Sequence, residues 1–435
     1  MKKPIFLLIF AVFLILGVFA SDDDLFFSDE NLFFDEVIIE EVIDENAETS
    51  SIFDFNIIET NKVDFGGNAS FSLGLQSMWQ NPFIEENQNA EYWLNGFKNA
   101  YLIPSLYVSL HFDARPSETL RIYGKAETQY PFEITVPGLT IPQVKVVELF
   151  TDFNIGEYSY FRFGKHSVKW GVGYFFSPAD VINIGKIDPE EPEKDVEGAI
   201  SLRSMFTFSG TQNCLYLYLI PDLNLEKGYL AKNVAFAGKY DFLVGNTEIG
   251  IGGWYKNNRP PKMIGTFTST LFDDIPVYGE VVLAYGLEEQ WLKEVEKDFI
   301  FQGTTGFSYT FKEPKINLAM QYFFNGFGAK NPSEIDDITF NEKASLYNKV
   351  GQHYLAVAFS KSEVFNEKFS LSGFGQISFS DFSGMGNLNI NYNLDRNCSF
   401  SFGPSLVFGK ENSEFARSGK ILSINLSVTL GGGSF

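Results

Sequence analysis

Apolar and polar residues alternate along many short segments of this chain, and the segment 420–430 shows the period most plainly. Every second residue there is large and apolar: Leu422, Ile424, Leu426, Val428 and Leu430. The residues between them are polar: Ser423, Asn425, Ser427 and Thr429. Because side chains alternate between the two faces of a β-strand, the pattern predicts a strand with one apolar face and one face in contact with water.

The segments 98–112 and 118–130 show the same alternation. In the second, one predicted face carries Leu120, Ile122 and Ala126, and the other carries Arg121, Tyr123, Lys125, Glu127 and Gln129. The segment 143–153 departs from the period because Val146 and Val147 are adjacent. Its two faces therefore stay unassigned.

Segments of this kind recur throughout residues 62–435, and they predict about 18 strands. The predicted strands are 63–78, 98–112, 118–130, 143–153, 157–169, 198–208, 212–220, 231–241, 246–256, 261–271, 275–286, 298–311, 315–325, 352–361, 367–380, 383–394, 398–408 and 420–430. Sixteen strands are the alternative, because the links near 257–261 and 380–384 are short.

The links between these segments alternate between short and long. The short ones are 115–118, 154–157, 209–211, 273–274, 312–314 and 395–397, and the long ones are 81–96, 131–142, 171–198, 221–228, 287–297, 326–351 and 409–419. Short turns on one side and long loops on the other are typical of outer-membrane β-barrels. We therefore predict an all-β fold, a transmembrane antiparallel β-barrel with both ends on the periplasmic side and room for an aqueous channel.

Two segments precede the predicted barrel. Residues 1–20 begin with two lysines, continue with an apolar stretch and end on a small residue, which predicts a secretory signal peptide; a membrane anchor is the alternative. Residues 21–61 contain 14 acids and no lysine or arginine, and we predict a disordered periplasmic tail. Its two Leu-Phe-Phe repeats leave open a motif that docks a periplasmic partner or enters the barrel mouth.

The net charge of −22 leaves −10 for residues 62–435 once these two segments are set aside, and this acidic balance argues against a nucleic-acid partner. None of the three histidines stands in an HExxH pattern, and the two cysteines form no CxxC pair. Gly171-Val172-Gly173 lacks the third glycine of a dinucleotide fingerprint. We therefore predict neither a cofactor, nor a metal, nor a catalytic site.

The stretch 161–171 combines several features of a barrel wall. Phe161 and Phe163 are predicted to face lipid, which turns Arg162, Gly164 and His166 toward the lumen. Trp170 is predicted to lie in the aromatic girdle at the membrane interface. Gly171 and Gly173 would then allow a sharp change of direction. As a unit, Tyr158–Leu202 resembles a family of porin-like outer-membrane barrels of diderm bacteria, in which an aromatic-Arg-x-Gly-(Lys/Arg) strand runs into Trp-Gly and a Pro-x-Asp loop. The resemblance implies a channel, although His166 stands where a Gln is expected.

The loop 171–198 is the third outward loop, which in porins commonly narrows the lumen. It carries Asp180, Asp188, Glu190, Glu191 and Glu193 among its acids. Across the lumen we expect the cations Arg121, Lys125, Arg162 and Arg203. Such an arrangement would select among polar solutes, while a solvated surface loop is the alternative.

These features together predict an outer-membrane channel for passive diffusion of small hydrophilic solutes. Two alternatives are a surface barrel that binds or adheres through its long loops, and a gated importer of hydrophobic compounds. The expected partners are outer-membrane lipid, the barrel-assembly machinery through a C-terminal signal at Phe435, and a second copy of the chain in a homo-oligomer.

Overall fold

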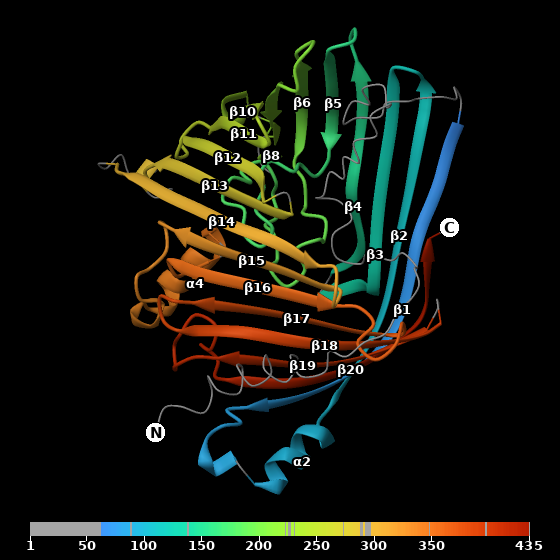
Figure 1. Cartoon of the computed structure of the whole chain (residues 1–435), viewed down its shortest axis with the longest axis vertical. Coiled ribbons are helices and arrows are strands. Elements are labelled where there is room, and N and C mark those ends of the chain that lie inside the picture. The colour runs from blue at the N-terminus through green and yellow to red at the C-terminus, as the bar shows by residue number, and fades with distance from the viewer. Residues whose placement is uncertain are drawn as a thin grey trace.

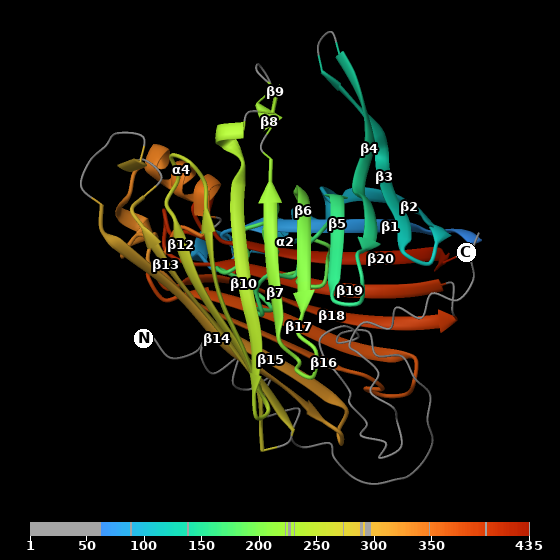
Figure 2. The same ribbon diagram turned by 90° about the horizontal axis from the view of Figure 1, so that it is seen from above.

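Eighteen antiparallel strands close into one barrel in the computed structural model of this chain (Figures 1 and 2). The structure describes residues 62–434, apart from 88, 137–138, 222, 225–227, 230, 273, 288–289, 292–296, 348 and 396–397. The predicted signal peptide 1–20, the tail 21–61 and the predicted assembly signal Phe435 lie outside the described residues. The predicted fold class, with 18 strands and not 16, is confirmed.

The barrel strands follow the order of the chain, with each strand paired to its neighbours in sequence. They are β1 (Lys62–Gln80), β2 (Tyr101–Ser117), β3 (Leu120–Val136), β4 (Leu139–Asn154), β5 (Ser159–Lys165), β6 (Ile200–Thr207), β7 (Cys214–Ile220), β10 (Ala235–Val244), β11 (Thr247–Tyr255), β12 (Lys262–Leu271), β13 (Ile275–Tyr285), β14 (Phe299–Phe311), β15 (Ile316–Asn325), β16 (His353–Lys361), β17 (Phe369–Ser378), β18 (Ser383–Asp395), β19 (Cys398–Phe408) and β20 (Ile421–Ser434). Pairing of β1 with both β2 and β20 closes the circle.

Smaller elements occupy the links. They are the helices α2 (Ala90–Lys98) and α4 (Asp337–Tyr347), the short helices η1 (Glu85–Asn87), η2 (Ala231–Asn233) and η3 (Pro332–Glu334), and the two-residue strands β8 (Leu223–Asn224) and β9 (Gly228–Tyr229). Within the described part of the chain, no helix is long and apolar enough to cross a membrane.

The two rims of the barrel differ as the link lengths predict. Lys62 pairs with Arg115 beside the short β2–β3 turn, and Asn68 pairs with Ser434, so β1 begins and β20 ends at the short-turn rim. The links that carry α2 and α4, and the link between β5 and β6, all leave the opposite, long-loop rim.

Alternation along each strand separates an apolar outer face from a packed inner face. On β13, Val281 is 50% exposed on the outside, whereas Glu280 and Val282 beside it are both 1% exposed on the inside. On β20, Leu426 faces outward, while Ser423 is buried and its hydroxyl lies 2.6 Å from that of Ser405. The outer surface is therefore apolar, although the molecule's inner face carries acids, amides and hydroxyls.

A β-bulge explains the segment whose faces the sequence left unassigned. Lys125 pairs with Glu148 and the next residue, Ala126, pairs with Val146, so Val147 has no partner of its own. An extra residue of this kind restores the alternation on both sides of it. Val147 is consequently buried while Val146 lies on the exposed face.

Two predicted boundaries are wrong. Residues 131–142 were expected to be a long loop, yet β3 and β4 continue as a two-stranded hairpin through most of this stretch, which includes Pro131 and Pro142 (Figure 2). There the strands have lost their other partners, since β2 pairs with β3 only up to Gln129 and β5 pairs with β4 only from Leu149. Such edge strands tolerate proline. Conversely, the strand predicted over 157–169 ends at Lys165.

Candidate functional site

The link between β5 and β6, residues 166–199, enters the barrel instead of staying at the rim; we call it the lumen segment. In Figures 1 and 2 it is the green coil between the strands. β5 ends after Gly164, whose φ of +134° is the region that favours glycine, and whose Cβ would lie 2.2 Å from the carbonyl oxygen of Leu149. The chain can therefore leave the wall there only because residue 164 has no side chain.

Glu280 on β13 fastens the lumen segment to the wall across the barrel. Its carboxylate accepts hydrogen bonds from the backbone N–H groups of Val172 at 2.5 Å, Gly173 at 2.6 Å and Ala179 at 2.8 Å. The hydroxyl of Ser177 donates to it at 2.9 Å. These donors stabilise a carboxylate that is buried away from bulk water. They come from both ends of the turn 172–179, so Glu280 holds the whole turn in place.

Gln321 on β15 holds the same turn at a second point. Its Oε1 accepts from the N–H of Phe175 at 2.6 Å, and its Nε2 donates to the carbonyl oxygen of Phe176 at 2.6 Å and to the hydroxyl of Thr304 at 2.6 Å. The side chain is fully buried. Because an amide uses both its donor and its acceptor here, the segment's backbone is recognised in one register only.

Gly171 and Gly173 make this close contact sterically feasible. A Cβ on Gly171 would lie 2.3 Å from Oε1 of Glu280, and a Cβ on Gly173 would lie 1.9 Å from the carbonyl oxygen of Phe176. Because neither residue has a side chain, the backbone can lie close to the wall at Gly171 and close to the rest of the turn at Gly173.

Apolar side chains of the lumen segment complete its packing against the wall. One cluster joins Val168, Trp170, Ala179, Ile182 and Ala199 to wall residues of β7, β10, β12 and β13, and a second joins Phe175 and Phe176 to Phe323, Tyr354 and Phe374. The structure corrects the expectation for Trp170, which is 2% exposed and packs edge-on against Tyr218 at 5.1 Å instead of lying in an interfacial girdle. Nζ of Lys239 on β10 donates a hydrogen bond to the backbone carbonyl oxygen of Trp170 at 3.2 Å.

The acids of the lumen segment have several kinds of partner. Asp180 is buried and accepts from the side-chain amide of Asn183, and Asp188 accepts from the N–H of Glu190, so these two act within the segment. Glu191 pairs with Lys194, and Glu193 accepts from the hydroxyl of Tyr174.

Acids of the lumen segment also reach the barrel wall, where Glu197 pairs with Lys165 on β5 at 2.8 Å and with Lys145 on β4 at 3.2 Å. Glu190 accepts from the side-chain amide of Asn387 on β18 at 3.3 Å, and Asp195 forms an ion pair of 2.8 Å with Lys125 on β3. Burial, and next the charge of Asp188, raise the pKa of Glu190.

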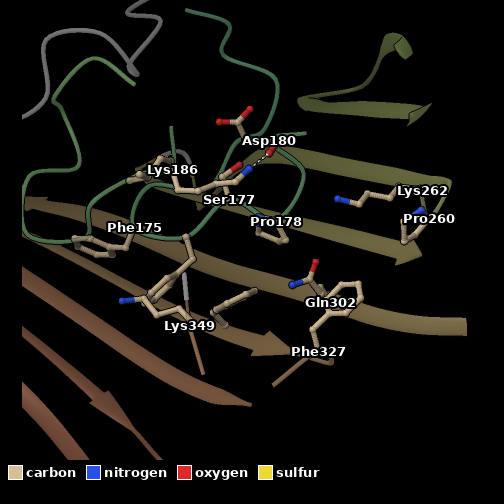
Figure 3. Close-up of a pocket in the computed structure, with 13 residues that line it drawn as sticks. Phe175, Ser177, Pro178, Asp180, Lys186, Pro260, Lys262, Gln302, Phe327 and Lys349 are labelled. Carbon is tan, nitrogen blue, oxygen red and sulfur yellow. Dashed lines mark hydrogen bonds between the residues drawn. The ribbon is translucent and has the colours of Figure 1, made fainter. Parts of the chain in front are cut away.

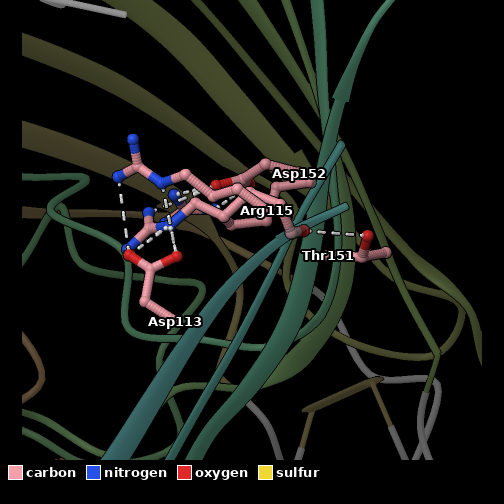
Figure 4. A network of polar contacts seen from close by, with 6 residues as sticks. Asp113, Arg115, Thr151 and Asp152 are labelled. Carbon is pink, nitrogen blue, oxygen red and sulfur yellow. Dashed lines mark hydrogen bonds and ion pairs between the residues drawn. The ribbon is translucent and has the colours of Figure 1, made fainter. Parts of the chain in front are cut away.

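The predicted lumen arginines lie together on one wall, beside the aspartates Asp113 and Asp152 that Figure 4 shows. Arg121 pairs with Asp113 at 2.9 Å and approaches Asp152 to 3.6 Å, while Arg162 binds both oxygens of Asp152 at 2.6 and 2.9 Å. Arg203 pairs with Arg162 in the strand register. The carboxylate partners of Arg121 and Arg162 are thus on the wall itself and not on the lumen segment. Of the four cations expected to face the segment, Lys125 pairs with one of its acids, Asp195.

This wall carries a net positive charge. Four arginines, 115, 121, 162 and 203, face two aspartates, 113 and 152, which leaves +2 if all are ionised. The acidic tip of the lumen segment, residues 188–193, meets β18, which stands on another side of the barrel. The acidic tip and this arginine-rich wall therefore lie on different sides of the lumen.

His166 is the residue at which the chain turns inward. It is fully buried, its Nδ1 lies 3.1 Å from the carbonyl oxygen of Gly164, and its Nε2 has no hydrogen-bond partner among the residues that the structure describes. Burial, and next the charge of Arg162, lower the pKa of the imidazole to about 4. The ring is therefore neutral near pH 7 and packs edge-on against Phe150.

A pocket of about 120 Å³ lies between the lumen segment and the ends of β12 and β14–β16 near the long-loop rim (Figure 3). The rings of Phe175, Phe176, Phe323 and Phe327 line it together with Lys186, Lys262, Lys349 and Asp180. Both apolar and charged groups are thus presented to a solute that enters from this rim.

The sequence did not predict which residues hold the lumen segment, and these are Glu280, Gln321 and Lys239. Each lies in the lumen-facing phase of a strand, where polar residues are common in any barrel. Their one distinguishing signal is a long polar side chain between small or apolar inward neighbours, as with Glu280 beside Tyr278 and Val282.

No family model matches this chain, and neither does any curated protein. Solved structures do match. Pseudomonas aeruginosa OccK8 (OprE) is 9% identical with a TM-score of 0.48 over 86% of this chain and 98% of that one. OccK3 (OpdO) of the same organism is 9% identical with a TM-score of 0.49 over 86% and 96%. The outer membrane channel DcaP of Acinetobacter baumannii is 12% identical with a TM-score of 0.43 over 86% and 98%. The residue roles described above come from this chain alone.

Proposed function

We propose that this protein spans the outer membrane of a diderm bacterium and passes small hydrophilic solutes by passive diffusion. An apolar outer surface around a closed barrel supports the membrane location, because a barrel leaves no unpaired strand edge in lipid. The charged and polar inner face supports a water-filled path, since such groups would be costly in a lumen filled with apolar matter.

The observation that carries the proposal is the lumen segment, fastened inside the barrel between a basic wall and β18. A segment so placed narrows the path without chemistry of its own. Opposite charges on different sides of a narrow passage order water and act on the dipole or charge of a passing solute. The same polar lining speaks against the importer of hydrophobic compounds.

Conductance in a planar lipid bilayer tests the proposal. Purified full-length protein should produce discrete steps of current in salt solution, and proteoliposomes should swell in a small sugar or amino acid. A surface barrel that only binds partners through its long loops would insert and give no current. Absence of both current and swelling in protein shown to be folded would therefore refute the channel.

The remaining expectations stay predictions. Recognition of Phe435 by the barrel-assembly machinery, docking of 21–61 to a periplasmic partner and homo-oligomerisation are each testable by deletion or cross-linking. Deletion of Phe435 should lower the inserted amount without altering the current of each inserted molecule.

A further inference from the structure

The link between β1 and β2 carries a helix on the outside of the barrel. Outward-facing positions alternate along β1, where Leu73 and Leu75 are 40% and 42% exposed. Trp79 has the same phase, yet it is 2% exposed. Its ring is covered by α2, whose Trp93 and Phe97 lie 5.5 and 4.9 Å away by ring centroids. The helix therefore sits on the lipid-facing side of the wall, as Figure 1 shows below β1.

Specific contacts hold α2 in this place. Nε1 of Trp79 donates to the carbonyl oxygen of Trp93 at 3.1 Å, and the hydroxyl of Tyr92 donates to the carbonyl oxygen of Gln80 at 2.5 Å. A Cβ on Gly96 would lie 2.0 Å from Nε1 of Trp79, so only glycine allows the helix to lie this close. The side chain of Asn89 caps the helix by accepting from the N–H of Tyr92.

One side of α2, next to the residues that pack on Trp79, carries exposed apolar side chains. Leu94 is 55% exposed, and Phe97 remains 56% exposed despite its contact with Trp79. Phe83 and Ile84 just before the helix, and Leu102 just after it, are exposed as well. Polar residues Glu91, Asn95 and Lys98 occupy the adjoining face. In water such a cluster would be unfavourable, so its occupant should be apolar.

The height of α2 along the wall identifies the occupant. Outward residues from Phe65 to Trp79 span about 46 Å of strand, or about 32 Å along the axis at a 45° tilt. The apolar band of an outer-membrane barrel is about 25 Å tall. If Phe65 lies near one edge of the band, Trp79 lies just beyond the other, where bilayer meets water. Aromatic residues are enriched at this depth, and α2 offers Tyr92 and Trp93.

We propose that α2 is a membrane-interface anchor, which lies flat in the lipid headgroup region with Leu94 and Phe97 inserted among the acyl chains. Its apolar side adjoins the lipid-facing surface of β1 and β20, because Trp79 pairs with Leu422 and Leu75 pairs with Leu426. Amphipathic helices bind membranes in this way. The inference rests on the barrel spanning a membrane and does not require that it conducts.

Site-directed spin labelling of the full-length protein in phosphatidylcholine vesicles tests the anchor. In a background with Cys214→Ser and Cys398→Ser, single cysteines are introduced as Leu94→Cys or Asn95→Cys and labelled with a nitroxide. These adjacent positions point about 100° apart on a helix. Collisions with oxygen, which dissolves in lipid, are compared with collisions with a water-soluble nickel chelate. The oxygen-to-nickel ratio should exceed one at Leu94 and fall below one at Asn95.

A third label at Leu426→Cys separates failure of the anchor from failure of the membrane assignment. Leu426 is 48% exposed on the outer face of β20. A ratio above one there, with nickel-dominated collisions at Leu94, would refute the anchor and leave the spanning barrel intact. A ratio below one at Leu426 would refute the spanning barrel as well. If Leu94 is shielded from both reagents, protein covers it, and the surface belongs to a second copy.

Discussion

Two long links leave the same rim of this barrel, and both carry acids, yet they end in different places. The lumen segment 166–199 is held by the buried carboxylate of Glu280 through three backbone N–H groups. The link 326–352 contains α4, whose ion pair between Asp337 and Arg417 is 2.7 Å long. The Asp337 side chain is 84% exposed.

This difference shows that side chains of the barrel wall determine whether a loop folds into the lumen. Buried hydrogen bonds to a charged group contribute about 1.5–3 kcal/mol each, whereas exposed ion pairs contribute about 0–1 kcal/mol. Acids alone do not draw a loop inward, because both links have them. What distinguishes the lumen segment is that Glu280 and Gln321, on strands across the barrel, bind its backbone.

The largest effect is expected from Glu280→Gln. The new amide nitrogen cannot accept a hydrogen bond, so at least one buried N–H loses its partner, at a cost of about 1–3 kcal/mol. A loss of about 2 kcal/mol would shift the ratio of fastened to released segment by roughly 30-fold. Single-channel current should rise and become noisier. Glu342→Gln in α4 is the matched control and should conduct like the parent; parent-like current in both variants would contradict the fastening.

Gly173→Ala should loosen the lumen segment by steric conflict. Its Cβ would meet the carbonyl oxygen of Phe176 at 1.9 Å, whereas the nearest atom to a Cβ on Gly375 is 3.9 Å away. We expect a Glu-specific protease to cleave the segment in the Gly173→Ala variant and to spare it in the parent and in Gly375→Ala. Equal resistance of all three proteins would show that the turn adapts without release.

Neutralising the tip of the lumen segment should alter selectivity. Glu190, Glu191 and Glu193 changed together to Gln remove negative charge from the lumen, so the reversal potential in a salt gradient should shift toward anions. Matched neutralisation of Glu334, Asp336 and Asp337 should do much less. The pKa of Glu190 is raised, so this side chain takes up a proton at a higher pH than an ordinary glutamate does. As the pH is lowered, the parent should therefore begin to lose its cation preference at that higher pH. The triple Gln variant should lack this step.

The smallest effect is expected from Arg417→Ala. It removes the ion pair with the exposed Asp337 carboxylate, hydrogen bonds to two backbone carbonyl oxygens and a contact with the ring of Phe340, so stability should fall while the current stays unchanged. Heat-dependent gel mobility and bilayer recording measure the two quantities. A change of current as large as that of Glu280→Gln would mean that α4 also controls the passage, and the contrast between the two links would fail.

The sequence by itself determined the wall of this protein. Apolar residues from Leu422 to Leu430 alternate with polar residues from Ser423 to Thr429. This pattern can be read from one strand alone, because each strand has lipid on one side whichever strands it pairs with. Link lengths then established which rim is which. The strand count follows from the same local signals, and the structure agrees with it.

Only the tertiary structure decided what fills the lumen. Glu280 and Gln321 are single polar residues on strands more than 100 positions from the backbone groups that they bind. Their small or apolar inward neighbours are the one local signal, and this signal does not identify the backbone groups that they bind. Trp170 was misplaced for the same reason, since its burial depends on Tyr218 across a curved wall. The Val147 bulge and the β3–β4 hairpin depend on where neighbouring strands stop, and closure of the barrel sets that register, which no local pattern encodes.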